Sequence, residues 1–217
     1  MNAVPPSPDP DRRPTAPAAG RRPHGASPRL TLGEPEDVRP GCLLVAMPVL
    51  ADPNFAGTVV YVVDHSATGT VGVVLNRPSE VRIADVLPVW SDLAVDPGVF
   101  HVGGPCESET ALCLAVTSTG VPGLQLVGDD VHLVDLDGDP EEVRSAVRGL
   151  RVFAGYAGWS PGQLRTEMVE GAWACVPGRA DDVLSEDGGD RLWHRVLRRQ
   201  AGARAVLSTA APDPTQN

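Results

Sequence analysis

The clearest pattern along the chain is a pair of apolar strings, rich in β-branched residues, that lie within residues 57–78. A seven-residue connection, mostly polar, separates the two strings, from Asp64 to Thr70. Short β-branched runs bounded by turn residues are typical of strands. The pattern therefore predicts a buried β-hairpin that returns over Asp64–Thr70 and ends at Asn76-Arg77-Pro78, where proline breaks the second strand.

Further apolar runs, separated by clusters of Gly, Pro and Asp, predict additional strands. They lie at Cys42–Met47, Val99–Val102, Leu112–Val116, Leu124–Val127, Val131–Val134, Arg151–Tyr156 and Ala172–Val176. A short helix is expected at Ile83–Leu87, where Pro88 stops it.

Three longer helices are predicted from capping residues and apolar spacing. Asp139-Pro140 favours a helix start, and apolar residues then follow at helical spacing up to Leu150. Ser160-Pro161 repeats this start for a helix that ends at Gly171. Asp190 caps a final helix with an apolar stripe of Leu192, Trp193, Val196 and Leu197.

These elements indicate a single α+β domain between two tails. Residues 1–38 are rich in Pro, Ala, Arg and Ser without periodicity, which predicts disorder, and residues 209–217 are polar and contain proline. The domain is therefore expected to span residues 39–208. Neither a bilayer-spanning apolar stretch nor the apolar core of a secretory signal is present, so we expect a cytoplasmic protein without a membrane partner.

Charge narrows the class of partner. The chain has 18 basic residues, all arginine, and 28 acidic residues, which gives a net charge of −10. Non-specific DNA affinity comes from neutralised phosphates, so an acidic body disfavours DNA binding. The only basic cluster in the body is on the final helix, at Arg191, Arg195, Arg198 and Arg199, and a solvated helix face is its simpler interpretation.

Cysteine spacing gives no sign of a metal or cofactor. Cys42, Cys106, Cys113 and Cys175 are far apart and lie in apolar strings, as buried structural thiols do. His101 with Cys106 and Cys113 lacks the ligand spacing of a zinc site. We therefore expect neither a metal nor a cofactor.

Three local motifs carry candidate chemistry. Asp64-His65-Ser66 has the residue types of a hydrolase triad, but neighbours in a turn cannot form the relay, which leaves His65 acting singly or inert. Gly103-Gly104-Pro105 follows a strand but lacks the spacing of a nucleotide loop, so its glycines either approach a ligand or allow close packing. Trp159-Ser160-Pro161-Gly162-Gln163 lies beside a helix start, where it either receives an anion or packs as structure. Glu167, one turn later, faces either the same cleft or solvent.

Several phrases in order resemble the YqgE/AlgH family of bacterial proteins, whose biochemical function is undetermined and whose members include some called transcriptional regulators. They are Gly41–Pro48, Asp52–Phe55, the hairpin with Asp64-His65, Gly72–Pro78, Val102–Pro105, Tyr156–Trp159, Gly162–Leu164 and Glu170–Trp173. The resemblance covers about three quarters of the chain and implies an α+β fold with a bent, partly barrel-like sheet flanked by helices. No helix-turn-helix is recognisable.

The chain departs from the family pattern at two positions. Val63 stands where the family often has a cysteine before the Asp-His pair, which argues against a redox role there. Arg165 follows Leu164 where the family commonly has glutamate, so a carboxylate is not available at that position.

The leading hypothesis is a non-catalytic regulatory module that binds a small ligand or a protein through its loops. One alternative is a hydrolase that uses His65 with Asp64 or Glu167, and another is a transcriptional regulator that acts on DNA directly or through a partner. Oligomeric state is not predicted. The candidate binding residues are Asn54, Phe55, His65, Asn76, Arg77, Gly103, Gly104, Trp159 and Gln163.

Overall fold

The computed structural model describes residues 33–118 and 124–200. Within them, short apolar runs form ten strands. These are β1 (Cys42–Ala46), β2 (Val59–Ser66), β3 (Gly69–Val74), β4 (Pro78–Arg82), β5 (Val99–Val102), β6 (Cys106–Thr117), β7 (Gln125–Gly128), β8 (Val131–Val134), β9 (Val147–Trp159) and β10 (Trp173–Pro177).

The helices of the described residues are short. They are the 3-10 helices η1 (Pro35–Asp37) and η2 (Pro88–Leu93), and the α-helices α1 (Ile83–Val86), α2 (Glu141–Arg144), α3 (Gln163–Val169), α4 (Ala180–Val183) and α5 (Asp190–Arg198). None of the helices in this part of the chain is long and apolar enough to cross a membrane.

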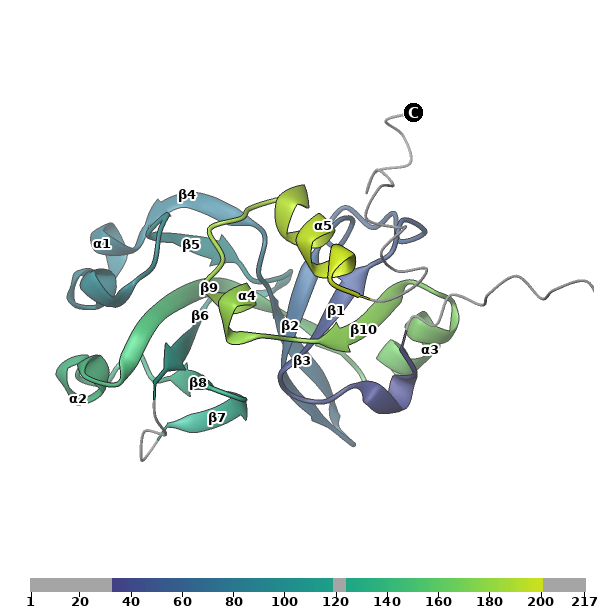
Figure 1. The fold of residues 1–217 in the computed structure, drawn as a ribbon, viewed down its shortest axis with the longest axis horizontal. Helices are drawn as coiled ribbons and strands as arrows, with labels where there is room; N and C mark the ends of the chain where they lie inside the picture. The colour runs from purple at the N-terminus through teal and green to yellow at the C-terminus, as the bar shows by residue number, and fades with distance from the viewer. Residues whose placement is uncertain (1–32, 119–123, 201–217) are drawn as a thin grey trace, which may run out of the picture.

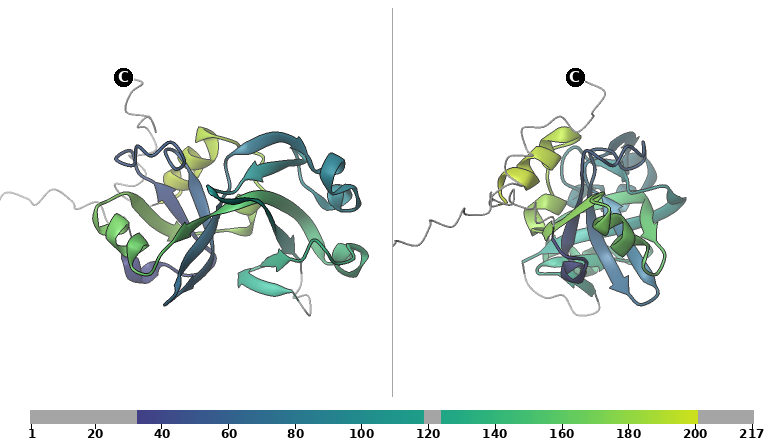
Figure 2. Two further views of the ribbon diagram at one scale, coloured as in Figure 1. Left: turned by 180° about the vertical axis from the view of Figure 1, so that it is seen from behind. Right: turned by 90° about the vertical axis from the view of Figure 1, so that its right-hand side faces the viewer.

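The strands form one curled sheet, predominantly antiparallel, in the order β10-β1-β2-β3-β9-β6-β8-β7. β4 and β5 branch from this path, and β5 pairs with β9 in parallel. β9 runs between the two ends of the molecule, with α1 and α2 at one end and α3 at the other (Figures 1 and 2). The α+β class predicted from the sequence is confirmed, and the sheet curls into a half-barrel as the family resemblance implies.

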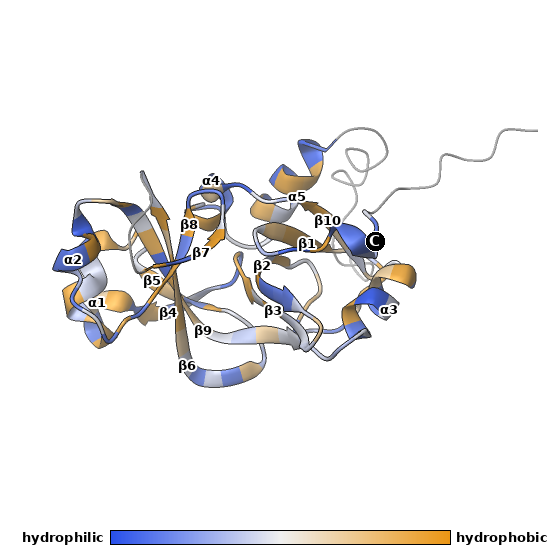
Figure 3. Ribbon diagram, turned by 90° about the horizontal axis from the view of Figure 1, so that it is seen from below, coloured by the Kyte–Doolittle hydropathy of each residue, from blue (hydrophilic) through white to orange (hydrophobic). Residues whose placement is uncertain are grey.

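Both faces of the sheet are covered. All five residues of β1 are buried, because α5 lies over one face and α3 over the other. The apolar stripe of α5 is buried as predicted, and Trp193 donates its indole N–H to the carbonyl of Ala46, 2.7 Å away. A third core cluster around Trp90 fills the opposite end under α1 and η2. In Figure 3 the outer part of β6 is hydrophilic, as its exposed residues require.

The predicted helix from Asp139 to Leu150 is wrong beyond its first turn. α2 ends at Arg144, and from Val147 the chain continues as β9, where Val147 pairs with Thr117 and Leu150 with Ala115. Its apolar residues are compatible with either period over so short a segment, and pairing with β6 buries them more completely than an isolated helix would.

The hairpin is confirmed, but its connection is shorter than predicted. β2 continues to Ser66 and β3 begins at Gly69, so only Ala67 and Thr68 form the turn. His65 pairs with Thr70 across the strands, which places Asp64, His65 and Ser66 in the ladder rather than in a loop. Successive residues of a strand point to opposite faces of the sheet, so the side chains of Asp64 and His65 lie on opposite faces.

Only one of the two predicted domain boundaries, near residue 39, lies within the described residues. Residues 33–38, which we assigned to the tail, include η1, and Val38 is buried in the core cluster beneath α3. Most of the two predicted tails, 1–32 and 209–217, lies outside the described residues.

Candidate functional site

The nine candidate residues do not form one surface. Six of them divide into three groups, and the other three are buried. The first group fixes the loop before β2. Arg77 donates to the carbonyl oxygens of Asn54 at 2.7 Å and Pro53 at 2.9 Å, and burial lowers the pKa of its guanidinium group. Asn54 is exposed at the tip of this loop. Because the guanidinium group of Arg77 donates to backbone carbonyls of this loop, its role in the structure is to hold the loop in place.

Asn76 lies inside the molecule. It is 2 % exposed, its side-chain oxygen accepts the N–H of Val59, and its side-chain nitrogen donates to the carbonyls of Gly57 and Gly189. These bonds join the hairpin to the loop before α5. Three of the four hydrogen bonds that the side-chain amide can make are therefore used within the protein.

Gly103 and Gly104 are also buried, as packing glycines. A Cβ on Gly103 would collide with the carbonyl oxygen of Gly155, and one on Gly104 would collide with the carbonyl of Tyr156. Of the two interpretations left open by the sequence, close packing of the backbone against β9 is the one that the structure shows.

The second group is an aromatic cluster that we call the tryptophan cluster: Phe55, Trp159, Gln163, Glu167 and Trp173. Phe55 stacks on Trp159 with ring centroids 6.0 Å apart. Glu167 lies at the centre and accepts the indole N–H groups of Trp159 at 2.9 Å and Trp173 at 2.8 Å. Its other oxygen accepts the side-chain amide of Gln163 at 2.9 Å.

Of the two roles predicted for the segment around Trp159 and Gln163, anion binding or structural packing, the structure shows packing. Trp159 is 5 % exposed, and the Gln163 side-chain oxygen accepts the N–H of Ser160, which fixes the loop before α3. Glu167 does share a face with Gln163, but its carboxylate is occupied by three N–H donors rather than directed at a cleft.

A Glu167→Gln variant should lose about 1–2 kcal/mol of unfolding free energy, because a carboxamide offers one oxygen where the cluster uses two. Urea unfolding followed by tryptophan fluorescence measures the loss. The matched control is Glu170→Gln, since Glu170 is exposed just after α3 and no side-chain bond is seen for it within the described residues. Equal stability of the two variants would contradict the role given to Glu167.

The third group contains His65, on the exposed end of the hairpin. His65 pairs with Thr70, and Thr70 pairs with Trp159, so these three residues form one row across the sheet. The Nδ1 atom of His65 lies 2.7 Å from the Thr70 hydroxyl. The row leads toward the tryptophan cluster on the same face of the sheet.

The opposite face of the same strands carries a cavity of about 360 Å³. Asp64 pairs with Val71 and Val71 with Gly158, so a second row lies on this face. We call the cavity the hairpin pocket; it is lined by Asp64, residues 68–71, Cys106, Tyr156 and residues 158–161. Gly158 forms part of its wall, because a Cβ there would lie 3.4 Å from the Tyr156 ring and 3.6 Å from the Cys106 sulfur.

The hairpin pocket offers three kinds of polar group. Asp64 supplies a carboxylate, Cys106 a free thiol, and Tyr156 a hydroxyl that donates to Glu107 at 3.2 Å. This bond to Glu107, followed by desolvation, raises the pKa of Tyr156. The pocket lining thus contains both hydrogen-bond donors and acceptors.

The sequence pointed to the region of the hairpin pocket but missed two of its lining residues. Cys106 was expected to be buried with the other three cysteines, which are buried, but it is half-exposed in the wall. Tyr156 was placed in a strand without a site role. Its alternation with Gly158 along β9 is the signal that places both residues on one face.

The arginines of the final helix are partly used within the protein. Arg199 forms an ion pair with the buried Asp182, and Arg195 pairs with Asp187 at 2.9 Å. Two of the four arginines of this basic cluster are therefore held by carboxylates. Within the described residues there is no group of three or more His, Cys, Asp and Glu placed to hold a metal ion.

Comparison with known proteins identifies the family. Residues 43–205 match the model of a domain family described as AlgH-like. A UPF0301 protein from Streptomyces avermitilis is 49 % identical over 183 residues, which is 82 % of this chain and 94 % of the relative. A UPF0301 protein from Rhodococcus opacus is 45 % identical over 197 residues, covering 85 % of this chain and 98 % of the relative.

Two solved structures share the fold. A crystal structure of a Corynebacterium diphtheriae protein matches with a TM-score of 0.75 and 34 % identity, over 79 % of this chain and 92 % of that one. The solution structure of the AlgH protein from Pseudomonas aeruginosa matches with a TM-score of 0.57 and 26 % identity, over 87 % of this chain and 98 % of that one. Because the family model matches residues 43–205 and these relatives are 45–49 % identical over most of their length, the chain belongs to the AlgH-like, or UPF0301, family.

Proposed function

We propose that this protein is a non-catalytic cytoplasmic binding module that takes up a small polar ligand in the hairpin pocket. The observation that carries the proposal is the pocket itself. It is formed between the tip of the β2–β3 hairpin and the end of β9, and it exposes a carboxylate, a thiol and a phenol to one space. The four free cysteines support a reducing compartment.

A binding role is favoured over hydrolysis because the acid-base groups of a hydrolase are not assembled. His65 bonds to Thr70 on the face opposite Asp64, and Glu167 bonds to two indoles and an amide. A general base must reach the group that it deprotonates, directly or through a water molecule. Neither partner suggested for His65 is bonded to it among the described residues.

The test is a thermal-shift screen of the full chain against polar metabolites, because a ligand that binds only the folded state raises the melting temperature. A Gly158→Val variant should abolish the shift, since the new side chain projects between Tyr156 and Cys106 and fills the pocket. Valine suits a strand position, so the fold is expected to persist.

The matched control is Ala111→Val, which introduces the same side chain on a strand of the sheet but at an exposed site that does not line the pocket. A shift that survives in Gly158→Val, or a screen in which no compound shifts the wild type, would refute the proposal. A shift lost in both variants would refute it as well, because the effect would then not be specific to the pocket.

A further inference from the structure

A second cavity, separate from the hairpin pocket, lies where three distant segments meet at glycines. Gly41 precedes β1, Gly128 ends β7 and Gly178 follows β10. A Cβ on Gly128 would lie 2.6 Å from the Cα atom of Gly41, and one on Gly178 would collide with the carbonyl oxygen of Gly41. The absence of side chains lets the three backbones touch and leaves a cavity of about 110 Å³, which we call the glycine pocket.

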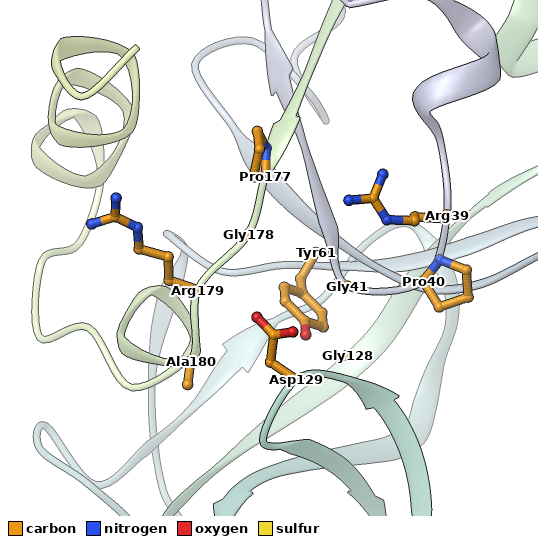
Figure 4. A pocket seen from close by; sticks show the side chains of 10 residues that line it. All are labelled: Arg39, Pro40, Gly41, Tyr61, Gly128, Asp129, Pro177, Gly178, Arg179 and Ala180. Carbon is orange, nitrogen blue, oxygen red and sulfur yellow. The ribbon is translucent and has the colours of Figure 1, made fainter.

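Tyr61 points into the glycine pocket from β2 (Figure 4). The residue is 2 % exposed, yet its hydroxyl makes no hydrogen bond to any described residue. Burial, and next the negative charge of Asp129, raise the pKa of Tyr61, so the group stays a neutral phenol that can donate and accept. Because this hydroxyl is not one of the fully enclosed polar atoms that lack a partner, it is reached from the cavity, and the cavity is where a partner would lie.

Three charged side chains line the glycine pocket. Figure 4 shows the Asp129 carboxylate next to Tyr61, with Arg39 and Arg179 on opposite sides of them and the guanidinium group of Arg179 directed away from Tyr61. The guanidinium group of Arg179 makes no hydrogen bond or ion pair within the described residues, and that of Arg39 reaches only the carbonyl of Asp37 at 3.4 Å. In the described part of the chain, five other arginines are paired with carboxylates.

These groups specify the chemistry of an occupant. Guanidinium groups only donate, so the rim requires an acidic group, while Asp129 only accepts, so the centre requires a donor. The cavity is well below the roughly 300–1,000 Å³ of pockets for drug-sized ligands, so the occupant is small. We propose that the glycine pocket binds a small organic acid that carries a hydroxyl or amino group beside its carboxylate.

The test is a titration of the ¹⁵N-labelled full chain with five probes, followed by NMR. Lactate and glycine carry both groups, acetate and sulfate carry only the acid, and ethanolamine carries a hydroxyl and a cationic amine but no acid. Lactate or glycine should move the amide signals of Gly41, Gly128 and Gly178 saturably. Acetate, sulfate and ethanolamine should bind at least roughly tenfold more weakly, because each leaves one side of the pocket unpaired.

Two variants locate the site. Tyr61→Phe and Arg179→Gln should each weaken binding roughly fivefold or more, as expected for one lost hydrogen bond, while Arg82→Gln on β4 should leave it unchanged. Tyr61→Phe should also keep the wild-type melting temperature without ligand, because the hydroxyl it removes has no partner among the described residues.

Three outcomes would overturn the inference: no saturable change with lactate or glycine, equal affinity for acetate, or unaltered binding in both pocket variants. Signals that move at Gly158 instead would place the ligand in the hairpin pocket, which would refute the present inference and leave the proposed function standing.

Discussion

An Asp182→Ala variant should lose about 3 kcal/mol of unfolding free energy, among the largest single-residue effects that we expect here. Asp182 is 2 % exposed and its two oxygens each lie 2.6 Å from a different nitrogen of Arg199. It also accepts the backbone N–H of Arg179 at 2.9 Å. Removing the carboxylate leaves the guanidinium group of Arg199 without its ion-pair partner, although that side chain is only 16 % exposed. Breaking such a buried pair typically costs about 3–5 kcal/mol, and partial access of Arg199 to water favours the lower end.

Chemical denaturation at neutral pH measures this loss. Asp181→Ala is the matched control, because Asp181 is the preceding residue, is exposed, and reaches only Arg148 at 3.9 Å. Its change should stay within about 0.5 kcal/mol. A double-mutant cycle with Arg199→Ala should return a positive coupling energy. An Asp182→Ala loss no larger than that of the control would contradict the structural role of the pair.

The same ion pair shows what a single sequence can and cannot predict. The apolar stripe of α5 follows a 3.6-residue period, so its buried face is predictable from local spacing alone. The partner of its arginines is not, because Asp182 lies on α4, and the chain must turn back between α4 and α5 to bring the two together. A basic helix face that looked free in the sequence is therefore half neutralised in the fold.

Strands were predictable where β-branched residues gathered between turn residues, as in β2 and β3. The segment from Val143 to Leu150 was not, because its apolar residues fit a helical period while the strand partner, β6, lies about thirty residues away. Tertiary pairing decided the outcome, which is the usual way in which local propensity is overridden.

The candidate site follows the same rule. The hairpin and the segment Gly158–Pro161 were recognisable as neighbours of a site, since both follow apolar strings and carry polar residues. Which residues face the pocket depends on the register between β2, β3 and β9. That register puts Asp64 in one row and His65 in the other, and no local pattern reveals it. Tyr61, Asp129 and Arg179 come from separate elements, so the glycine pocket has no sequence signature at all.

Acid should destabilise the protein through the buried residue His101. His101 is 2 % exposed, and its Nε2 atom accepts a hydrogen bond from the guanidinium group of the buried Arg151. The Nδ1 atom then carries the proton and faces the carbonyl of Val99 at 3.3 Å. Burial, and next the charge of Arg151, lower the pKa of His101 from 6.5 to about 4. The folded state therefore holds a neutral ring whose protonation would place two positive groups in contact.

The direction of the pH effect follows from this lowered pKa. Above pH 6.5 the ring is neutral in both states and stability is complete. Between pH 6.5 and about 4 the unfolded chain takes up a proton that the folded protein refuses, so stability falls as the pH falls. The shift corresponds to a loss of about 3 kcal/mol across that interval. Unfolding free energies measured by denaturant at several pH values give the slope.

Carboxylates also contribute to acid unfolding, so the decisive quantity is the difference between the wild type and His101→Gln. Glutamine keeps an oxygen that can accept from Arg151 but does not titrate. The variant should be less stable at pH 7, because it loses the ring that packs against Phe153. Its stability should nevertheless fall less steeply between pH 6.5 and 4, and the two curves should converge toward pH 4. Parallel curves would show that His101 is protonated in the folded protein and that Arg151 does not hold it neutral.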